Sequence, residues 1–294
     1  MSYHQILSKS VSDILYGCEG LWELVKNKSI GSNEKKIPEL KDEIIEDISK
    51  KRRIIETHDD EWFFTEKDLA FQGLKNLGIN KYMEIKSKLI KKDNYFENED
   101  LLKSARDSQI HTFGWPIGVF ADIKDYSPKP RKEGITAKIS INTDNDTSFD
   151  YWSLRQNGDF YLLKSLFEDK RKPDTIFFNT RIVRITETLL YLRNLYSNLG
   201  VDNNQIIEIT IKHGGLKDCV LGVAGGRRML FENHKIEESE VSSTVRTNIK
   251  DIDINTVDVV ESFTKTLFEM FKFFKLDRNV LEDIVNKYIK GETS

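Results

Sequence analysis

The chain has 294 residues, of which 38% are hydrophobic and 11% aromatic. A chain of this length and composition can bury a sizeable core, which excludes a wholly disordered protein and allows two domains of ordinary size. Its 45 basic and 48 acidic residues nearly cancel to a net charge of -3. The chain is therefore no bulk polycation, and any nucleic-acid site must be a local patch.

Two cysteines, Cys18 and Cys219, are too few for a disulfide framework or a cysteine-rich metal site. The first residues lack a signal pattern, and no run approaches the ~18 apolar residues that a membrane span needs. We therefore expect a cytoplasmic protein with no membrane segment, no metal and no cofactor.

The first third of the chain has the apolar period of helices. Helices are predicted over 4–28 and over 38–55, where proline takes the first helical position. Thr65 and Asp68 resemble a capping box, which predicts a third helix to about Leu77.

A fourth helix is predicted from Asn80 to Lys92, separated from the third by Gly78. It carries five lysines, and with the third helix it resembles a DNA-reading helix-turn-helix. Because acidic residues neutralise the first third of the chain, a solvated helix face is the alternative interpretation.

From Ile110 the pattern changes to runs that Gly, Pro, Asn and Asp clusters bound, as is typical of strands. The segment 159–169 is too short to assign to a helix or a strand. A hairpin turn is predicted over 142–148. Strands are predicted over 110–123, 135–141, 205–212, 219–224 and 240–249.

The clearest helix covers 179–199, where apolar residues alternate three and four apart, and Gly200 ends it. A further helix is predicted over 256–274, and a last one from the N-cap Asp277 to Gly291. We therefore predict an α+β fold, in which a helical part precedes an α/β domain with a mixed or antiparallel sheet and C-terminal helices.

The change of pattern predicts a domain boundary near residue 105. Dense charge and helical periodicity give way there to strand patterning with Gly and Pro. A helical domain over 1–105 would then precede a sensor-like α/β domain over 106–294.

Arg181 and Arg184 are the first candidate ligand-binding residues. They lie one turn apart near the predicted start of the 179–199 helix, where the helix dipole disfavours cations unless an anion compensates. A bound phosphate or nucleotide would supply that anion. Pairing with acids such as Glu187 or Asp174 is the alternative.

Arg227 and Arg228 are the second candidates, since they follow a predicted strand and the pair Gly225 and Gly226. Glycine allows a backbone to approach a ligand closely, and arginine supplies charge. The spacing of a phosphate-binding P-loop is absent, so a plain turn with exposed arginines remains the alternative.

Two short patterns indicate nuclease chemistry. Arg106 and His111 have the R-x4-H spacing of metal-independent HEPN ribonucleases, although His111 opens a predicted strand rather than lying on a helix. Glu84 and Lys86, with Asp68 upstream, have the E-x-K pattern of PD-(D/E)xK nucleases, in which carboxylates bind Mg²⁺. That chemistry needs both side chains on one face of a strand, whereas a helix is predicted here.

The region from Ile110 onward, about two-thirds of the chain, resembles a C-terminal module of uncharacterised bacterial proteins. Some of these carry a Schlafen-type AlbA nucleic-acid-binding domain ahead of the module, but residues 1–105 do not contain that domain. The matching stretches are HTFGWPIGVF (111–120), DYWSLRQNGDFYLLKSLFED (150–169), FFNTRIVRITETLLYLRNLY (177–196) and 276–291.

The resemblance implies a recurring module that is joined to different front ends, as sensors and adaptors are, and it transfers no catalytic residue. We therefore expect a non-catalytic sensor or adaptor of a bacterial nucleic-acid-directed system such as antiphage defence. It would recognise a nucleotide, a nucleic acid or a partner protein, and relay this to an effector. The alternatives are a nuclease acting on RNA or DNA and a helix-turn-helix transcription regulator.

Overall fold

The computed structural model describes residues 61–90, 94–110, 115–143, 147–166, 172–225, 230, 234–273 and 275–292. Residues 66–90 and 94–294 form one compact unit. Of a second unit, which comprises Met1–Thr65 and Lys91–Asp93, only 61–65 are described, and they are helical. The helices predicted over 4–28 and 38–55 lie outside the described residues.

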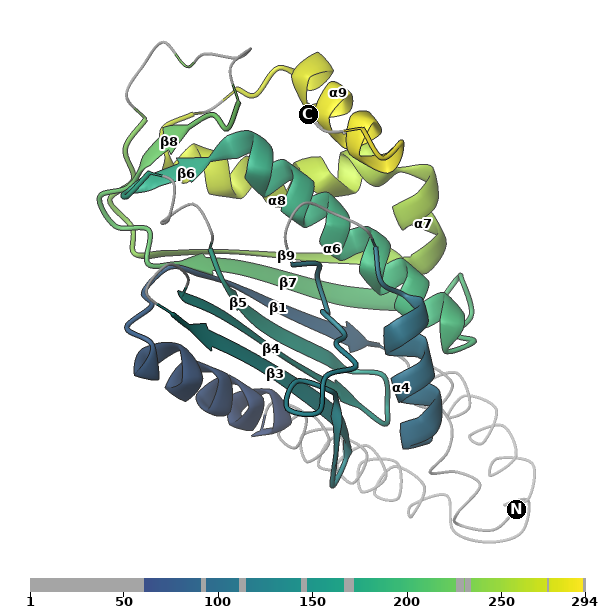
Figure 1. Ribbon diagram of the computed structural model, residues 1–294. Helices are drawn as coiled ribbons and strands as arrows, with labels where there is room; N and C mark the ends of the chain where they lie inside the picture. Colours follow the sequence, from purple (N-terminus) through teal and green to yellow (C-terminus); the bar gives the residue numbers. More distant parts are fainter. Residues whose placement is uncertain are drawn as a thin grey trace, which may run out of the picture. The chain divides into compact units, whose positions relative to one another are not determined.

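Among the described residues, a seven-stranded sheet forms the centre of the larger unit, in the order β2-β3-β4-β5-β1-β7-β9 (Figure 1). Every pair of neighbouring strands is antiparallel. The predicted α+β class is therefore confirmed. The strands are β1 (Tyr82–Leu89), β2 (Lys129–Arg131), β3 (Gly134–Asn142), β4 (Thr147–Arg155), β5 (Phe160–Ser165), β7 (Ile206–Gly214) and β9 (Glu240–Asn248).

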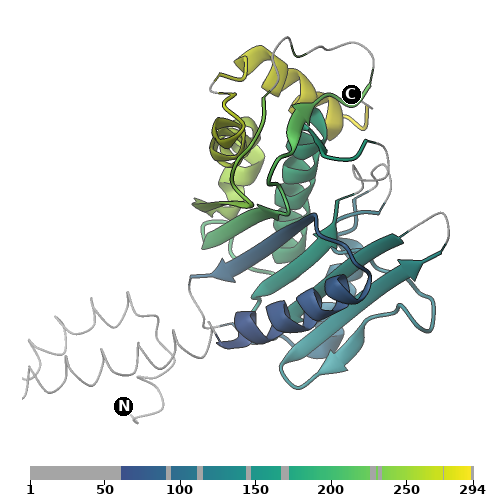
Figure 2. The same ribbon diagram turned by 90° about the vertical axis from the view of Figure 1, so that its left-hand side faces the viewer.

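Helices cover one face of the sheet, as Figures 1 and 2 show. The longest, α6, contacts each of the other helices on this face. A short parallel pair, β6 (Thr175–Phe177) and β8 (Val220–Gly222), lies next to the start of α6. The helices are α4 (Asn98–Asp107), α6 (Phe178–Asn198), α7 (Ile249–Ile254), α8 (Thr256–Met270) and α9 (Arg278–Ile289).

Helix α6 confirms the predicted helix over 179–199. Its apolar stripe is the centre of the core, and Leu189, Leu192 and Tyr196 are fully buried. Burial of one such side chain stabilises the fold by about 1.5 to 3 kcal/mol. Gly200 follows in the left-handed region with a φ of 72°, which glycine adopts without strain, so the helix ends as predicted.

A helix over 66–76, the cover helix, lies on the opposite face of the sheet (Figure 2). Successive residues of a strand point to opposite faces. Strand β4 therefore presents Trp152 to the core around α6, and Phe149 and Tyr151 to the cover helix.

The helix predicted over 80–92 is wrong, because most of this segment is strand β1, paired with β5 and β7. Its residues Met83, Ile85 and Leu89 are fully buried at every second or fourth position, which is the period of a strand. Burial in the centre of the sheet outweighs the helical preference of the intervening lysines. The predicted helix-turn-helix therefore lacks its second helix.

The predicted boundary near residue 105 divides elements that share one sheet, since β1 pairs with strands that follow it by more than 70 residues. The larger unit begins instead at Glu66. The prediction of a strand over 110–123 is wrong at residues 115–123, because these residues form turns and a loop. The undecided segment 159–169 contains β5.

The remaining predicted strands correspond to β3, β7, β8 and β9. The predicted N-cap Asp277 is confirmed, since its side chain accepts a hydrogen bond from Asn279 N at 2.8 Å. No helix in the described part of the chain is both long enough and apolar enough to cross a membrane.

Candidate anion-binding groove

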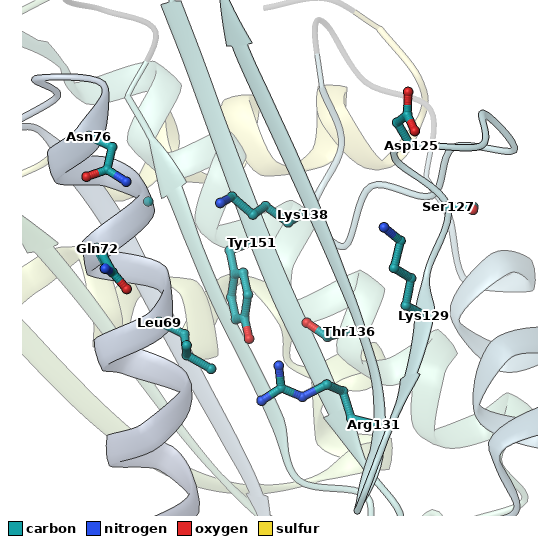
Figure 3. Close-up of a pocket in the computed structure, with 11 residues that line it drawn as sticks. Leu69, Gln72, Asn76, Asp125, Ser127, Lys129, Arg131, Thr136, Lys138 and Tyr151 are labelled. Atoms are coloured by element: carbon teal, nitrogen blue, oxygen red, sulfur yellow. The ribbon is translucent and has the colours of Figure 1, made fainter.

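A groove with a volume of about 460 Å³ lies between the cover helix and the strands β2, β3 and β4 (Figure 3). It is lined by three cationic side chains and one carboxylate, together with uncharged polar and apolar groups. The lining residues are Leu69, Gln72, Gly73, Asn76, Asp125, Ser127, Lys129, Arg131, Thr136, Lys138 and Tyr151.

Strand geometry gathers the cations on one wall. Lys129 and Arg131 alternate along β2, so they share a face, and Lys129 pairs directly with Thr136 of β3. Lys138 is two residues further along β3 and pairs with Tyr151 of β4. All five side chains therefore belong to one face of the sheet, and Arg131 and Lys138 extend toward the cover helix in Figure 3.

The cover helix forms the other wall. Gly73 allows it to approach the sheet closely, since a Cβ atom at this position would lie 2.5 Å from the ring of Phe149. Gln72 and Asn76, one turn apart, line the groove with amide groups. These amides can both donate and accept hydrogen bonds, so this wall can bind the polar edge of a ligand.

A buried acid fixes the floor of the groove. The hydroxyl of Tyr151 donates a hydrogen bond to Glu66 Oε2 at 2.5 Å, and Glu66 is only 3% exposed. Burial, followed by the contact with Glu66, raises the pKa of Tyr151, so its hydroxyl remains a donor at neutral pH. Arg131 Nη2 lies 3.7 Å from Glu66 Oε1, which orients the guanidinium without enclosing it.

The other two cations have no counter-ion in the described part of the chain. Lys138 Nζ lies 6.0 Å from the ring centroid of Phe149, and both Lys129 and Lys138 are exposed. Three cations that line one groove can bind an anion through charge-assisted hydrogen bonds. Phosphate suits such a site because arginine can contact two of its oxygens at once.

The predicted ligand-binding residues Arg181 and Arg184 lie elsewhere, in the core, with 1% and 4% exposure. Arg184 Nη1 donates to Glu187 Oε2 at 2.6 Å and to the carbonyl oxygen of Trp115 at 3.0 Å. The alternative prediction, a pair with Glu187, is therefore confirmed for Arg184. Neither arginine is accessible to a ligand in this structure.

Arg184 belongs to a larger buried cluster of charges. Lys164 Nζ lies 3.2 Å from Asp150 Oδ1 and donates to Trp115 O at 3.0 Å, while Glu187 Oε1 accepts a hydrogen bond from Ile117 N at 2.8 Å. Burial raises the pKa of Asp150 and lowers that of Lys164, and the attraction between the two opposes both shifts. The cluster anchors the loop at 115–117 to β4, β5 and α6.

Arg181 influences a buried histidine. His213 on β7 is 3% exposed, and its Nε2 has no hydrogen-bond partner among the described residues. Burial, and next the positive charge of Arg181, lower the pKa of His213 well below 6.5. His213 is therefore neutral in the folded chain.

The nuclease candidate Arg106 is exposed at the end of α4, where its Nη2 lies 3.3 Å from Asp122 Oδ1 and its guanidinium 4.7 Å from the ring of Phe120. Its proposed partner His111 lies outside the described residues. The second candidate ligand-binding pair, Arg227 and Arg228, lies outside them too.

The residues of the E-x-K pattern, Glu84 and Lys86, lie on a strand and not on a helix. Glu84 and Lys86 share one face of β1, with Glu84 Oε1 3.9 Å from Lys86 Nζ, whereas Asp68 is exposed on the cover helix. The expectation that helical spacing separates Glu84 from Lys86 is therefore wrong. In the described ranges, no three His, Cys, Asp or Glu side chains are grouped so as to hold a metal ion.

Sequence reasoning missed the groove, although one signal was present. The run Lys129, Pro130, Arg131 and Lys132, followed by alternating Thr136 and Lys138, marks a hairpin with a basic face. What the sequence does not show is the cover helix, which comes from a distant segment and turns this face into a groove.

Models of known protein families, curated proteins and solved structures were compared with the chain, and none of them matches it. The groove is thus assigned from its own geometry and chemistry.

Proposed function

We propose that this protein is a non-catalytic sensor that binds a nucleotide in the groove between the cover helix and β2–β4. The observation that carries the proposal is that Lys129, Arg131 and Lys138 line the same groove. Lys129 and Lys138 have no counter-ion among the described residues, so an anionic ligand would compensate charges that the fold leaves open.

The size of the groove favours a nucleotide over a nucleic acid. A volume of about 460 Å³ is that of a small-molecule site. A polymer would instead need a continuous basic surface, and the chain as a whole has a net charge of -3. The phosphates would contact the cationic wall, and Gln72 and Asn76 would hydrogen-bond to the base or the ribose.

The wider role follows the class expected from the sequence. The chain would act in the cytoplasm as a sensor or adaptor that passes nucleotide binding to an effector. A setting in bacterial defence depends only on the resemblance of the C-terminal region.

The test is isothermal titration calorimetry of the full chain with inorganic pyrophosphate and with ATP. Replacing Lys129, Arg131 and Lys138 together by Gln should weaken binding more than about tenfold, since each lost charged contact is worth about 1.5 to 3 kcal/mol. The two lysines are exposed and should contribute little to the melting temperature, whereas losing the contact of Arg131 with Glu66 should lower it slightly. A melting curve therefore checks that the variant is folded at the temperature of the titration. Binding should also weaken as salt screens the charges.

Lys132→Gln is the matched control, because Lys132 is exposed in the same hairpin but does not line the groove. It should bind pyrophosphate and ATP as the native chain does. Equal binding by the triple variant, or no binding by the native chain, would contradict the proposal. Binding of a single-stranded oligonucleotide without binding of ATP would favour a nucleic acid instead.

A further inference from the structure

The two edges of the sheet differ in how well they are protected. β2 has three residues, and Pro130 and two basic side chains make it a poor template for another strand. β9 has nine residues, from Glu240 to Asn248, and contains neither proline nor lysine. A long edge strand without such protection readily pairs with a further strand.

The register shows which backbone groups of β9 face outward. Ile249 N donates to Gln205 O, and Ile249 continues the β7–β9 ladder, so the odd-numbered residues of β9 bond to β7. The backbone groups of Ser242, Thr244 and Arg246 therefore point away from the sheet. In the described part of the chain, β9 is the last strand of the sheet, so no described strand pairs with these outward groups.

The sequence of β9 is complementary to itself. Two copies that pair antiparallel about a two-fold axis at Ser243 place Glu240 opposite Arg246 of the second copy, and Ser242 opposite Thr244. These are even-numbered residues, whose backbone groups face outward and whose side chains share one face of the sheet. Moving the axis to Ser242 or Thr244 keeps the faces matched but loses the pairing of opposite charges.

Neighbouring charges extend this pairing. Glu240 Oε2 lies 2.7 Å from Lys212 Nζ, and Arg246 Nε lies 2.7 Å from Glu208 Oε2. Charges of alternating sign therefore form a row across the two-fold axis. The row consists of Lys212 and Glu240 of one copy, followed by Arg246 and Glu208 of the second copy. Opposite charges on directly paired residues stabilise a sheet, and like charges destabilise it.

We propose that β9 is a dimer interface, through which a second copy of this chain pairs antiparallel about Ser243 and extends the sheet across both copies. On the inner face, Val241 would pair with Val245 of the second copy. The interface is separate from the nucleotide groove, which lies toward the opposite edge of the sheet.

The first experiment is sedimentation equilibrium of the full chain. The native chain should dimerise at about 10 to 100 µM. Thr244→Pro removes one outward N–H and leaves the backbone bonds to β7 intact, although it also removes the hydrogen bond at 2.8 Å between the hydroxyls of Thr244 and Thr210. It should raise the dissociation constant at least about tenfold. Thermal denaturation checks that this variant folds.

The second experiment exchanges charges. Glu240→Arg and Arg246→Glu each place like charges opposite one another in a homodimer, so each variant should be monomeric. An equimolar mixture pairs two arginines with two glutamates and should form a heterodimer. Loss of stability in either variant cannot produce this rescue.

A native chain that remains monomeric at these concentrations would overturn the proposal and leave the edge to a strand of another protein. A dimer that tolerates Thr244→Pro and both charge variants would also overturn it, because its interface would lie elsewhere. A mixture of the two charge variants that does not associate would exclude the register about Ser243.

Discussion

Cationic side chains on the two faces of the sheet have opposite surroundings. On the α6 face, Lys164 and Arg184 are buried and paired with Asp150 and Glu187. On the face of the cover helix, Lys138 and its neighbours are exposed and two of the three have no counter-ion in the described residues. A positive charge in the sequence can therefore contact a ligand only where the fold leaves it exposed.

Desolvation explains the difference. A buried charge loses its hydration and must be compensated by an opposite charge and by hydrogen bonds, as at Arg184. An exposed lysine keeps its hydration, so the fold tolerates it without a partner. An exposed lysine can exchange its hydrating water for a phosphate group, which is a stronger ligand. A buried arginine that is already paired with an acid has no such water to exchange.

The contrast between the two faces would be wrong if the buried cluster of charges could lose one charge at little cost in the free energy of unfolding. Glu187→Gln keeps an acceptor for Ile117 N but leaves Arg184 without its closest counter-charge, and should cost about 3 to 5 kcal/mol in the free energy of unfolding. Urea denaturation measures this cost. Asp122→Asn, which breaks an exposed pair with Arg106, should cost less than about 1 kcal/mol. Similar costs for both variants would show that the cluster is solvated.

The same truncation on the two faces sharpens the comparison. Leu189→Ala should cost about 2 to 5 kcal/mol, because Leu189 is fully buried under the sheet and a cavity remains. Leu69→Ala on the cover helix should cost about 1 kcal/mol or less, since Leu69 is 38% exposed in the groove. If Leu69→Ala is the more damaging of the two, the cover helix rather than α6 organises the core.

The smallest effect concerns pH. The pKa of His213 is lowered in the folded chain, so below about pH 6.5 the unfolded chain binds a proton that the folded chain does not. Stability should therefore fall as the pH decreases from about 7 to 5, by up to about 1.4 kcal/mol per unit from this one group.

His213→Gln should make this part of the pH dependence disappear, which denaturation at several pH values can show. If the pH dependence of stability were the same in His213→Gln and in the native chain, His213 would be protonated in the folded state, and burial would not lower its pKa.

Local patterns predicted much of the fold. The stripe over 179–199 and the N-cap Asp277 gave α6 and α9, because a periodic apolar face and a capping side chain act within a few residues. The helix prediction for the segment 80–92 was wrong. The lysines of this segment favour a helix, whereas the spacing of its apolar residues favours a strand. Only pairing with β5 and β7, both distant in sequence, decides between them.

The prediction of binding sites depends on distant contacts even more strongly than the prediction of the fold. The helix-dipole argument drew attention to Arg181 and Arg184, but whether an arginine at a helix start meets a ligand or an acid depends on what packs over it. The sequence by itself determined the α+β class, the core helix and the N-cap of the last helix. The tertiary structure alone decided that β1 lies in the sheet, that Arg181 and Arg184 are buried, and that the cover helix makes the hairpin of β2 and β3 one wall of a groove. The physical reason is that burial and ion pairing depend on contacts between distant segments, whereas helix and turn patterns depend on near neighbours.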